Sequence, residues 1–280
     1  MRFKKAVVYI FGVAIISVMF LKPVYADEVD DLISKLNNAS DMEKPTIVFQ
    51  LAETRDPRIV QALIEFGKEA DFMQRLVYIA PFNLLGNIAV KQLAQAMKSD
   101  DVKIRRFATK AIGLAASTMG VFSRENITSD EIRGVADSRA IQPLLEALKD
   151  KDKIVRINAA CSLGMLGRED GLDVAISGLK DDNWKVVVEA IDALGWIANK
   201  KGLEALETLY NNTTPPTEEA LHEAYSMYPA DFAALTPEYK NIIVFQMLQE
   251  NINRAKYYSS EEHLKLEREM LQKHREFVDE

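Results

Sequence analysis

The sequence predicts an all-α protein whose central part consists of repeated pairs of short helices. Three observations lead to this fold class. A segment recurs at a fixed spacing, each copy carries apolar residues at helical spacing, and the alternating patterns typical of strands are nearly absent. The composition, 48% hydrophobic and 28% charged over 280 residues, is that of a globular protein and argues against a multi-span membrane protein.

Charge and cysteine content exclude two kinds of function. The formal net charge is −7, whereas affinity for a phosphate backbone needs a surplus of Lys and Arg, so nucleic acid is not an expected partner. Cys161 is the only cysteine, which excludes an internal disulfide and a Cys-rich zinc site.

Residues 1–26 have the features of a signal peptide. Basic residues precede an uncharged run from Ala6 to Leu21, and Val24 and Ala26 supply small residues at positions −3 and −1 of a cleavage site. We therefore expect cleavage between Ala26 and Asp27 and a periplasmic or secreted bacterial protein. The alternative is an uncleaved N-terminal anchor, which would be the only route to membrane contact.

The strongest signal in the chain is an internal repeat. Residues 148–164 match residues 179–195 position by position, and residues 97–113 form a third copy further upstream. The third copy is separated from the next one by a longer stretch of chain than the other two are from each other. The longer separation indicates an insertion, which we assign to about residues 117–135.

Each copy predicts one amphipathic helix. In residues 148–164, Val155, Ala159 and Leu163 fall at i, i+4 and i+8, on one helical face. An Asp or Asn precedes each helix as the expected N-cap, and a glycine follows its last apolar residue, where a left-handed cap or a close helix approach requires no Cβ. The N-cap candidates are Asp101, Asp152 and Asn183, and the glycines are Gly113, Gly164 and Gly195.

A second amphipathic helix belongs to each unit. Its apolar positions Ile141, Leu144, Leu145 and Leu148 recur in the next unit as Leu172, Ala175, Ile176 and Leu179. Further upstream, the segment from Asp56 to Glu65 resembles the segment from Asp137 to Glu146.

Together these features resemble HEAT repeats. The pattern Asp152-x-x-Val155-Arg156-x-x-Ala159-Ala160-x-x-Leu163-Gly164 is most similar to the short bacterial type, with about 30 residues per unit, first named for phycobilisome lyases. The resemblance covers about residues 56–212. It implies a right-handed α-solenoid in which the second helices, those of the Ile141 type, line a concave face.

Four regions are expected along the chain. They are the signal peptide (1–26), an N-terminal helical cap (27–55), the HEAT-like repeats (56–212) and a C-terminal helical region (213–280). In the last region Thr236 and a capping box at Ser259 start helices. The final helix is interpreted as a solvated cap that closes the solenoid, with a partner-binding or coiled-coil arm as the alternative.

No enzyme motif is recognisable in the sequence. Phosphate-binding glycine loops, dinucleotide-binding motifs and nucleophile elbows are absent. Deoxyhypusine hydroxylases, which are built on these repeats, bind iron through recurring His-Glu pairs, but residues 56–212 contain no histidine. Catalytic, cofactor-binding and metal-binding residues are therefore not predicted, and no cofactor is expected.

Several conspicuous side chains are interpreted structurally. Arg105 and Arg156 are expected to form a ladder with carboxylates or carbonyl groups of neighbouring repeats, and Cys161 is expected to be a buried, inert thiol. His222, His263 and His274 have no metal-ligand spacing and are expected to be exposed or to cap helices.

The leading hypothesis is an exported, non-enzymatic scaffold or adaptor that binds a protein or peptide on its concave face. The candidate partner-binding residues recur once in every repeat unit without being apolar: Gln142, Asp173 and Glu204 in one row, and Glu146, Ser177 and Thr208 in a second. The alternatives are an enzyme of the HEAT-repeat lyase or hydroxylase type and a purely structural envelope component. Binding through the insertion or the C-terminal helices also stays open.

Overall fold

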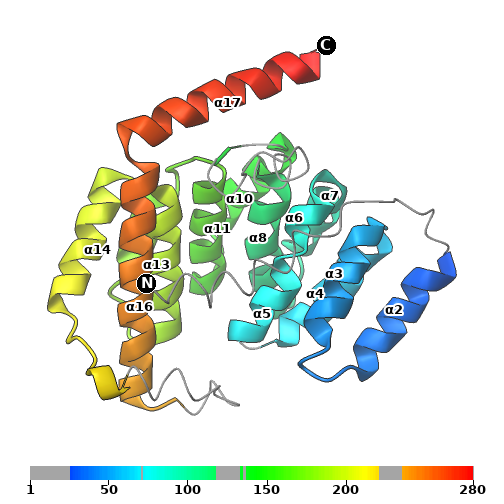
Figure 1. Ribbon diagram of the computed structural model, residues 1–280, viewed down its shortest axis with the longest axis horizontal. Coiled ribbons are helices and arrows are strands. Elements are labelled where there is room, and N and C mark those ends of the chain that lie inside the picture. Colours follow the sequence, from blue (N-terminus) through cyan, green and yellow to red (C-terminus); the bar gives the residue numbers. More distant parts are fainter. Residues whose placement is uncertain (1–25, 71, 118–132, 135–136, 221–234, 280) are drawn as a thin grey trace.

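A computed structural model describes residues 26–70, 72–117, 133–134, 137–220 and 235–279, and this part of the chain forms helices and turns without a strand. The all-α prediction is therefore confirmed (Figure 1). The helices are α2 (Ala26–Asn38), α3 (Lys44–Thr54), α4 (Arg58–Glu69), α5 (Phe72–Ile79), α6 (Phe82–Leu85), α7 (Asn87–Ala96), α8 (Val102–Ala116), η3 (Ser138–Ala140), α10 (Ile141–Ala147), α11 (Lys153–Met165), α12 (Leu172–Gly178), α13 (Trp184–Ile197), α14 (Lys200–Asn212), α16 (Pro237–Tyr258) and α17 (Glu261–Asp279).

Two predicted segments fall largely outside this description. Residues 1–25 of the signal peptide and residues 118–132 of the insertion are not among the described residues. Within the described ranges, no helix combines the length and the apolar character needed to cross a bilayer.

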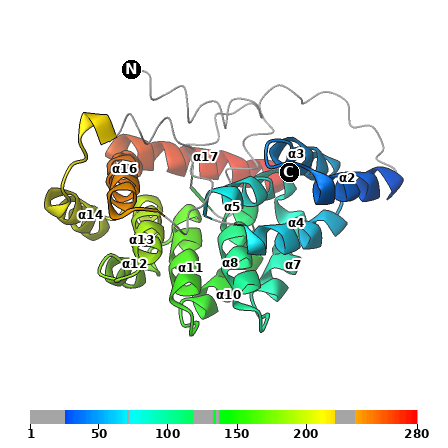
Figure 2. The same cartoon turned by 90° about the horizontal axis from the view of Figure 1, so that it is seen from below.

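Two layers of helices form a solenoid. Helices α8, α11, α13 and α16 pack side by side as an inner layer, and α7, α10, α12 and α14 pack against them as an outer layer. In Figure 2 the outer helices α10 and α12 lie below the inner ones, while the N-terminal helices α2 and α3 rise at one end and α14 and α16 at the other. The array is thus curved, with the inner layer on its concave side.

This arrangement corrects the expectation that the Ile141-type helices line the concave face. Neighbouring inner helices are in direct contact, whereas α10 packs mainly on α11 and the adjoining η3. The layer at the smaller radius of a curved array has the shorter helix spacing, so the concave layer is the one whose helices touch. The pattern of the sequence defines both helix faces but not the direction in which the stack bends.

Small residues permit the close spacing of the inner layer. A Cβ on Gly113 would lie 2.6 Å from Oγ of Ser162, and one on Gly164 would lie 2.8 Å from the backbone nitrogen of Ile197. Both glycines lie inside helices that continue beyond them, so close helix approach explains them and a left-handed cap does not. The same contact recurs between Gly195 and Asn251, so α16 packs on α13 as a further inner helix.

The predicted helical phase and caps are confirmed. Val155, Ala159 and Leu163 are 0–1% exposed in the core. The side chains of the three N-cap candidates accept hydrogen bonds from backbone N–H groups in the first turns of their helices: Asp101, Asp152 and Asn183.

The predicted arginine ladder is confirmed for Arg105, which reaches the next repeat unit, whereas Arg156 bonds only within its own unit. Arg105 is 5% exposed and donates to the carboxylate of Asp150 in the next unit at 2.9 Å, as well as to two carbonyl groups in the preceding turn. Arg156 donates to the carbonyl oxygens of Asp150 and Lys151.

The last helix, α17, leaves the array at α16 and runs above the ends of the other helices toward the N-terminal half (Figure 1). Thr236 caps α16 by accepting a hydrogen bond from the Tyr239 N–H, as predicted. At the start of α17 the capping hydroxyl belongs to Ser260, which accepts from the His263 N–H at 3.2 Å, so the cap lies one residue later than the sequence pattern suggested.

Candidate functional site

Charged side chains from four helices meet the Cys161 thiol of a fifth on the inner side of the solenoid. The inner-face cluster comprises Arg75 of α5, Lys110 of α8, Cys161 of α11, Glu189 and Asp192 of α13, and Arg254 of α16. Its carboxylates and its lysine are largely buried, so each charge depends on a partner within the cluster.

Lys110 is the central residue of the inner-face cluster. Its Nζ lies 2.6 Å from Oδ2 of Asp192 and 3.0 Å from Oε2 of Glu189, and it donates to Sγ of Cys161 at 3.1 Å. Lys110, Cys161 and Asp192 occupy the same position in three successive repeat units, because they align when the copies that begin at Met97, Leu148 and Leu179 are superposed. The lysine side chain therefore reaches across α11, where the compact thiol leaves room for it.

Arg254 closes the cluster from the opposite side. Its Nη1 lies 2.7 Å from Oδ1 of Asp192, and its second nitrogen pairs with Glu250 at 2.8 Å. The guanidinium also lies 4.5 Å from the centroid of the Trp196 ring, a cation–π geometry. Asp192 thus receives one cation from α8 and another from α16, which ties the ends of the inner layer together.

The electrostatics of the cluster favour fully charged groups. Burial by itself would raise the pKa of Asp192, but Lys110 and Arg254 outweigh it and hold that pKa well below its usual range. Burial also opposes the charge on Lys110, yet Asp192 and its neighbours raise the pKa of Lys110 well above its ordinary value. The three cations of the cluster face Glu189, Asp192 and the adjoining Glu250, so no positive charge is left over for an anionic ligand.

The Cys161 thiol in this cluster is buried and is a poor nucleophile. Cys161 is 0% exposed, and burial together with the nearby Asp192 carboxylate raises the pKa of its thiol. A thiol that stays protonated is a poor nucleophile. The predicted burial of this cysteine is confirmed.

A second buried group joins α17 to the inner layer. Arg133 pairs with Glu267 at 3.0 Å and donates from Nη1 to the carbonyl oxygens of Trp196 and Ile197, where α13 ends. Burial raises the pKa of the adjacent Tyr258 to about 12. Sequence reasoning missed this group because nothing in the insertion marks Arg133 as a helix C-cap.

One histidine prediction is wrong. His263 is 2% exposed and its Nε2 lies 2.9 Å from Oε1 of Glu267, whereas an exposed or capping residue was expected. It is buried because α17 turns back against Tyr257 and Tyr258, whose ring centroids lie 4.6 Å and 4.8 Å from the imidazole. The side chains of the other two histidines, His222 and His274, are outside the described residues.

The six predicted partner-binding residues all lie in the outer layer and are all exposed. We call them the outer polar rows: Gln142 and Glu146 on α10, Asp173 and Ser177 on α12, and Glu204 and Thr208 on α14. The expected concave position is corrected, because these helices form the outer layer (Figure 2). Their side chains make only local contacts, of which the longest in sequence joins Asp173 to Lys201 at 2.8 Å.

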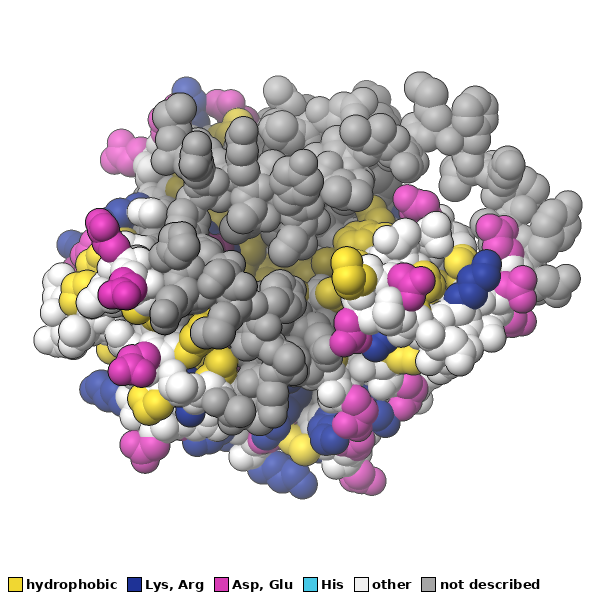
Figure 3. Space-filling model, turned by 60° about the horizontal axis from the view of Figure 1, so that its bottom comes forward, with side chains coloured by type: hydrophobic (Ala, Val, Ile, Leu, Met, Phe, Trp, Pro, Cys, Tyr) yellow, Lys and Arg dark blue, Asp and Glu magenta, His cyan; other side chains and the backbone are white. Residues whose placement is uncertain are grey.

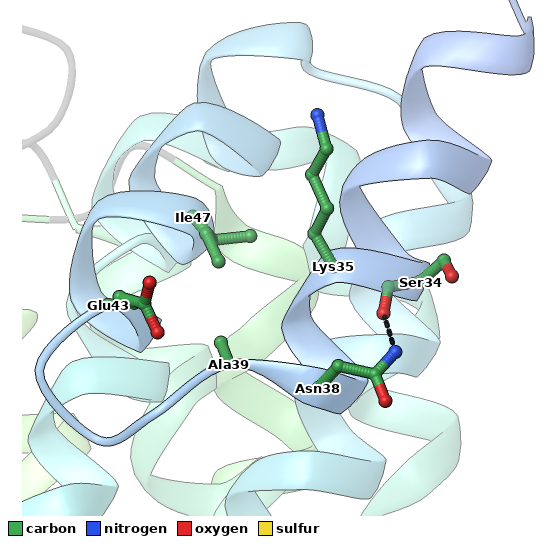
Figure 4. Close-up of a pocket in the computed structure, with 6 residues that line it drawn as sticks. All are labelled: Ser34, Lys35, Asn38, Ala39, Glu43 and Ile47. Carbon is green, nitrogen blue, oxygen red and sulfur yellow. Dashed lines mark hydrogen bonds between the residues drawn. The ribbon is translucent and has the colours of Figure 1, made fainter.

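The rest of the described surface holds no cluster of reactive side chains. A pocket of about 360 Å³ lies between α2 and α3, and its lining includes Lys35 and Glu43 without any cluster of reactive groups (Figure 4). The described ranges contain no group of three or more His, Cys, Asp or Glu residues that could hold a metal ion. Figure 3 shows coloured Lys, Arg, Asp and Glu side chains intermingled over the visible face, with no broad patch of one sign.

Comparison with known proteins supports the nature of the repeats. The family model for HEAT repeats matches residues 141–225, from α10 past the end of α14. This part of the chain therefore consists of HEAT repeats, in agreement with the resemblance seen in the sequence. Solenoids of this class commonly serve as scaffolds or bind protein partners. A search of curated proteins finds no significant match to the chain.

The solved structures to which this chain is similar are distant. An engineered protein from the Northeast Structural Genomics Consortium is 14% identical, with 82% of this chain and 96% of that chain covered and a TM-score of 0.34. Human deoxyhypusine hydroxylase in complex with glycerol is 14% identical, with 84% and 86% covered and a TM-score of 0.33. A designed armadillo repeat protein is 16% identical, with 81% and 100% covered and a TM-score of 0.32. Likenesses at this level carry no argument about activity.

Proposed function

We propose that this protein is an exported HEAT-repeat scaffold that binds a protein or peptide partner along its outer polar rows. The observation that carries the proposal is the exposure of all six row residues, two in each repeat unit, next to repeat positions that are buried. A solenoid holds such side chains in fixed positions because its core lies elsewhere, between the two layers.

The inner side of the solenoid supports this choice indirectly. The cations of the inner-face cluster are already paired, Lys110 with Glu189 and Asp192, and Arg254 with Asp192 and Glu250. A ligand that used these groups would have to break buried ion pairs, which is costly. Within the described part of the chain, the residues of the outer polar rows form no buried ion pairs, because their contacts are local and exposed, so a ligand can bind them without that cost.

The chemistry of the rows favours a basic or amide-rich partner segment. Glu146, Asp173 and Glu204 supply three carboxylates, and Gln142, Ser177 and Thr208 add polar groups that can donate or accept hydrogen bonds. The outer helices α10, α12 and α14 follow one another along the array at a wider spacing than the touching inner helices, so the rows suit an extended peptide or a helix that crosses all three.

Charge reversal tests the binding surface. Asp173→Lys together with Glu204→Lys should leave the fold intact and abolish capture of the partner from envelope extracts. Binding by the unmodified protein should weaken as salt rises. The matched control is Glu53→Lys with Glu219→Lys, two exposed carboxylates away from the rows, which changes the net charge equally. Undiminished capture by the row variant would refute the outer polar rows as the site.

Export rests on residues 1–26 and has its own test. N-terminal sequencing of the purified protein should begin at Asp27, and fractionation should place it outside the cytoplasm. Soluble cytoplasmic protein that starts at Met1 would contradict export without affecting the binding surface.

A further inference from the structure

A row of lysines follows one edge of the solenoid, at the turns that join outer to inner helices. Lys98, Lys149 and Lys180 occupy the same position in successive repeat units, each being the second residue of its copy. All three are exposed, as is Lys151 in the middle turn. We call these four residues the lysine edge. Among the described residues, none of the four forms an ion pair.

Most acidic residues of the same turns form ion pairs or cap helices. Asp150 pairs with Arg105 at 2.9 Å, Asp152 pairs with Arg106 at 2.6 Å, and Asp181 pairs with Lys153 at 2.7 Å. Asp101 caps α8 through its side chain. These carboxylates are therefore engaged in helix caps and ion pairs, whereas the four lysines are exposed and, within the described ranges, unpaired.

Two further carboxylates limit what the edge can bind. Asp100 and Asp182 are exposed in the first and third turns and have no ion pair among the described residues. Counting the described residues, the edge has four unpaired lysines and two unpaired aspartates. It is therefore positively charged, although the formal net charge of the whole chain is −7. A ligand with continuous negative charge would meet both repulsive carboxylates, whereas a ligand with spaced charges could avoid them.

We infer that the lysine edge binds an acidic protein segment in an extended, polyproline II-like conformation. Equivalent lysines lie one repeat unit apart, at the turns between the two layers, so their spacing is of the order of the distance between packed helices, about 8–10 Å. A polyproline II helix has three residues per turn and rises about 3.1 Å per residue, so every third side chain lies on one face, about 9 Å from the next. An acidic residue at every third position therefore matches Lys98, Lys149 and Lys180.

Other anionic partners fit this edge less well. An anionic membrane surface is recognised by a cluster of about four to eight basic residues. The lysine edge has four lysines spread over three repeat units, with the exposed carboxylates Asp100 and Asp182 among them. A nucleic acid carries a phosphate on every nucleotide and would place charge against Asp100 and Asp182. The preferred ligand is thus a peptide with intermittent carboxylates.

The test uses a fluorescent peptide of repeating Glu-Pro-Pro units and anisotropy at low salt. The full chain should bind it, and Lys98→Glu, Lys149→Glu and Lys180→Glu combined should weaken binding at least about tenfold, with a weaker effect of salt. The matched control combines Lys35→Glu, Lys91→Glu and Lys200→Glu, three exposed lysines away from the edge with the same charge change. Circular dichroism checks that both variants fold.

Spacing and ligand class are tested separately. A peptide of Glu-Pro-Pro-Pro units distributes the same charges around the helix and should bind at least about threefold more weakly. Vesicles with anionic lipid should not be captured. The inference would be overturned if both lysine variants lost peptide binding equally, or if the two peptides bound with equal affinity. It would also be overturned if the lysine edge captured vesicles but not the peptide.

Discussion

Nζ of Lys110 lies 2.6 Å from Oδ2 of Asp192, although the two residues belong to helices separated by α11. The pair spans two repeat units, because Lys110, Cys161 and Asp192 occupy one repeat position in three successive copies. Most contacts in a solenoid join nearest neighbours. This pair therefore adds a longer-range contact that links α8 directly to α13.

Removing the lysine tests this contact. Lys110→Met keeps most of the side-chain volume but leaves Glu189 and Asp192 with less compensation in a buried setting. The free energy of unfolding should fall by about 3–5 kcal/mol, measured by urea denaturation. Lys35→Met, on an exposed site, should stay within about 0.5 kcal/mol of the parent. A loss below about 1 kcal/mol for Lys110→Met would show that the cluster contributes little to stability.

The pKa of Asp192 predicts an acid-sensitive fold. Because that pKa is lower in the folded state than in the unfolded chain, ionised Asp192 stabilises the fold. Its contribution is complete above the ordinary aspartate pKa of about 4 and is lost as the pH falls below it. Asp192→Asn should therefore show a smaller decrease in unfolding free energy between about pH 5 and about pH 3. Parallel pH profiles for the two proteins would contradict this assignment.

The helical phase of the repeat is tested by a buried and an exposed residue of α11. Leu163→Ala should cost about 2–5 kcal/mol, since the side chain is 0% exposed and its loss leaves a cavity. Lys153→Ala removes an exposed ion pair with Asp181 and should cost at most about 1 kcal/mol. Thermal and urea unfolding of both variants measure the difference, and similar losses would mean that the phase is wrong.

Glycine replacement tests the close spacing of the inner layer. In Gly164→Ala the new Cβ would lie within 3 Å of the backbone around Ile197, so a helix must shift. We expect a loss of about 1–3 kcal/mol. Gly202→Ala is the control, because its nearest neighbours are side-chain atoms of Leu194 and Leu172 at 3.1 Å and 3.3 Å, which can adjust. Its effect should stay within about 1 kcal/mol, and equal effects at both sites would argue against close approach as the reason for Gly164.

Much of the local structure could be predicted from the sequence because it depends on neighbours in the chain. The apolar spacing of Val155, Ala159 and Leu163 defines a buried face, and Asp152 caps the helix that carries it. The regular internal offset between copies identifies repeated helix pairs, which cannot bury their apolar faces alone and must therefore stack. These features established the all-α fold and the exposure of the outer polar rows.

The tertiary structure decided which layer is concave and which charges meet. Curvature depends on how closely successive helices approach, and that distance results from contacts such as Gly164 against the backbone of α13. The partners of Lys110, Arg133 and His263 come from helices far away in the sequence, so no local spacing reveals them. The sequence by itself determined the repeats and the two faces of each helix, whereas the stacking of whole helices determined the direction of the bend and the partners in the buried ion pairs.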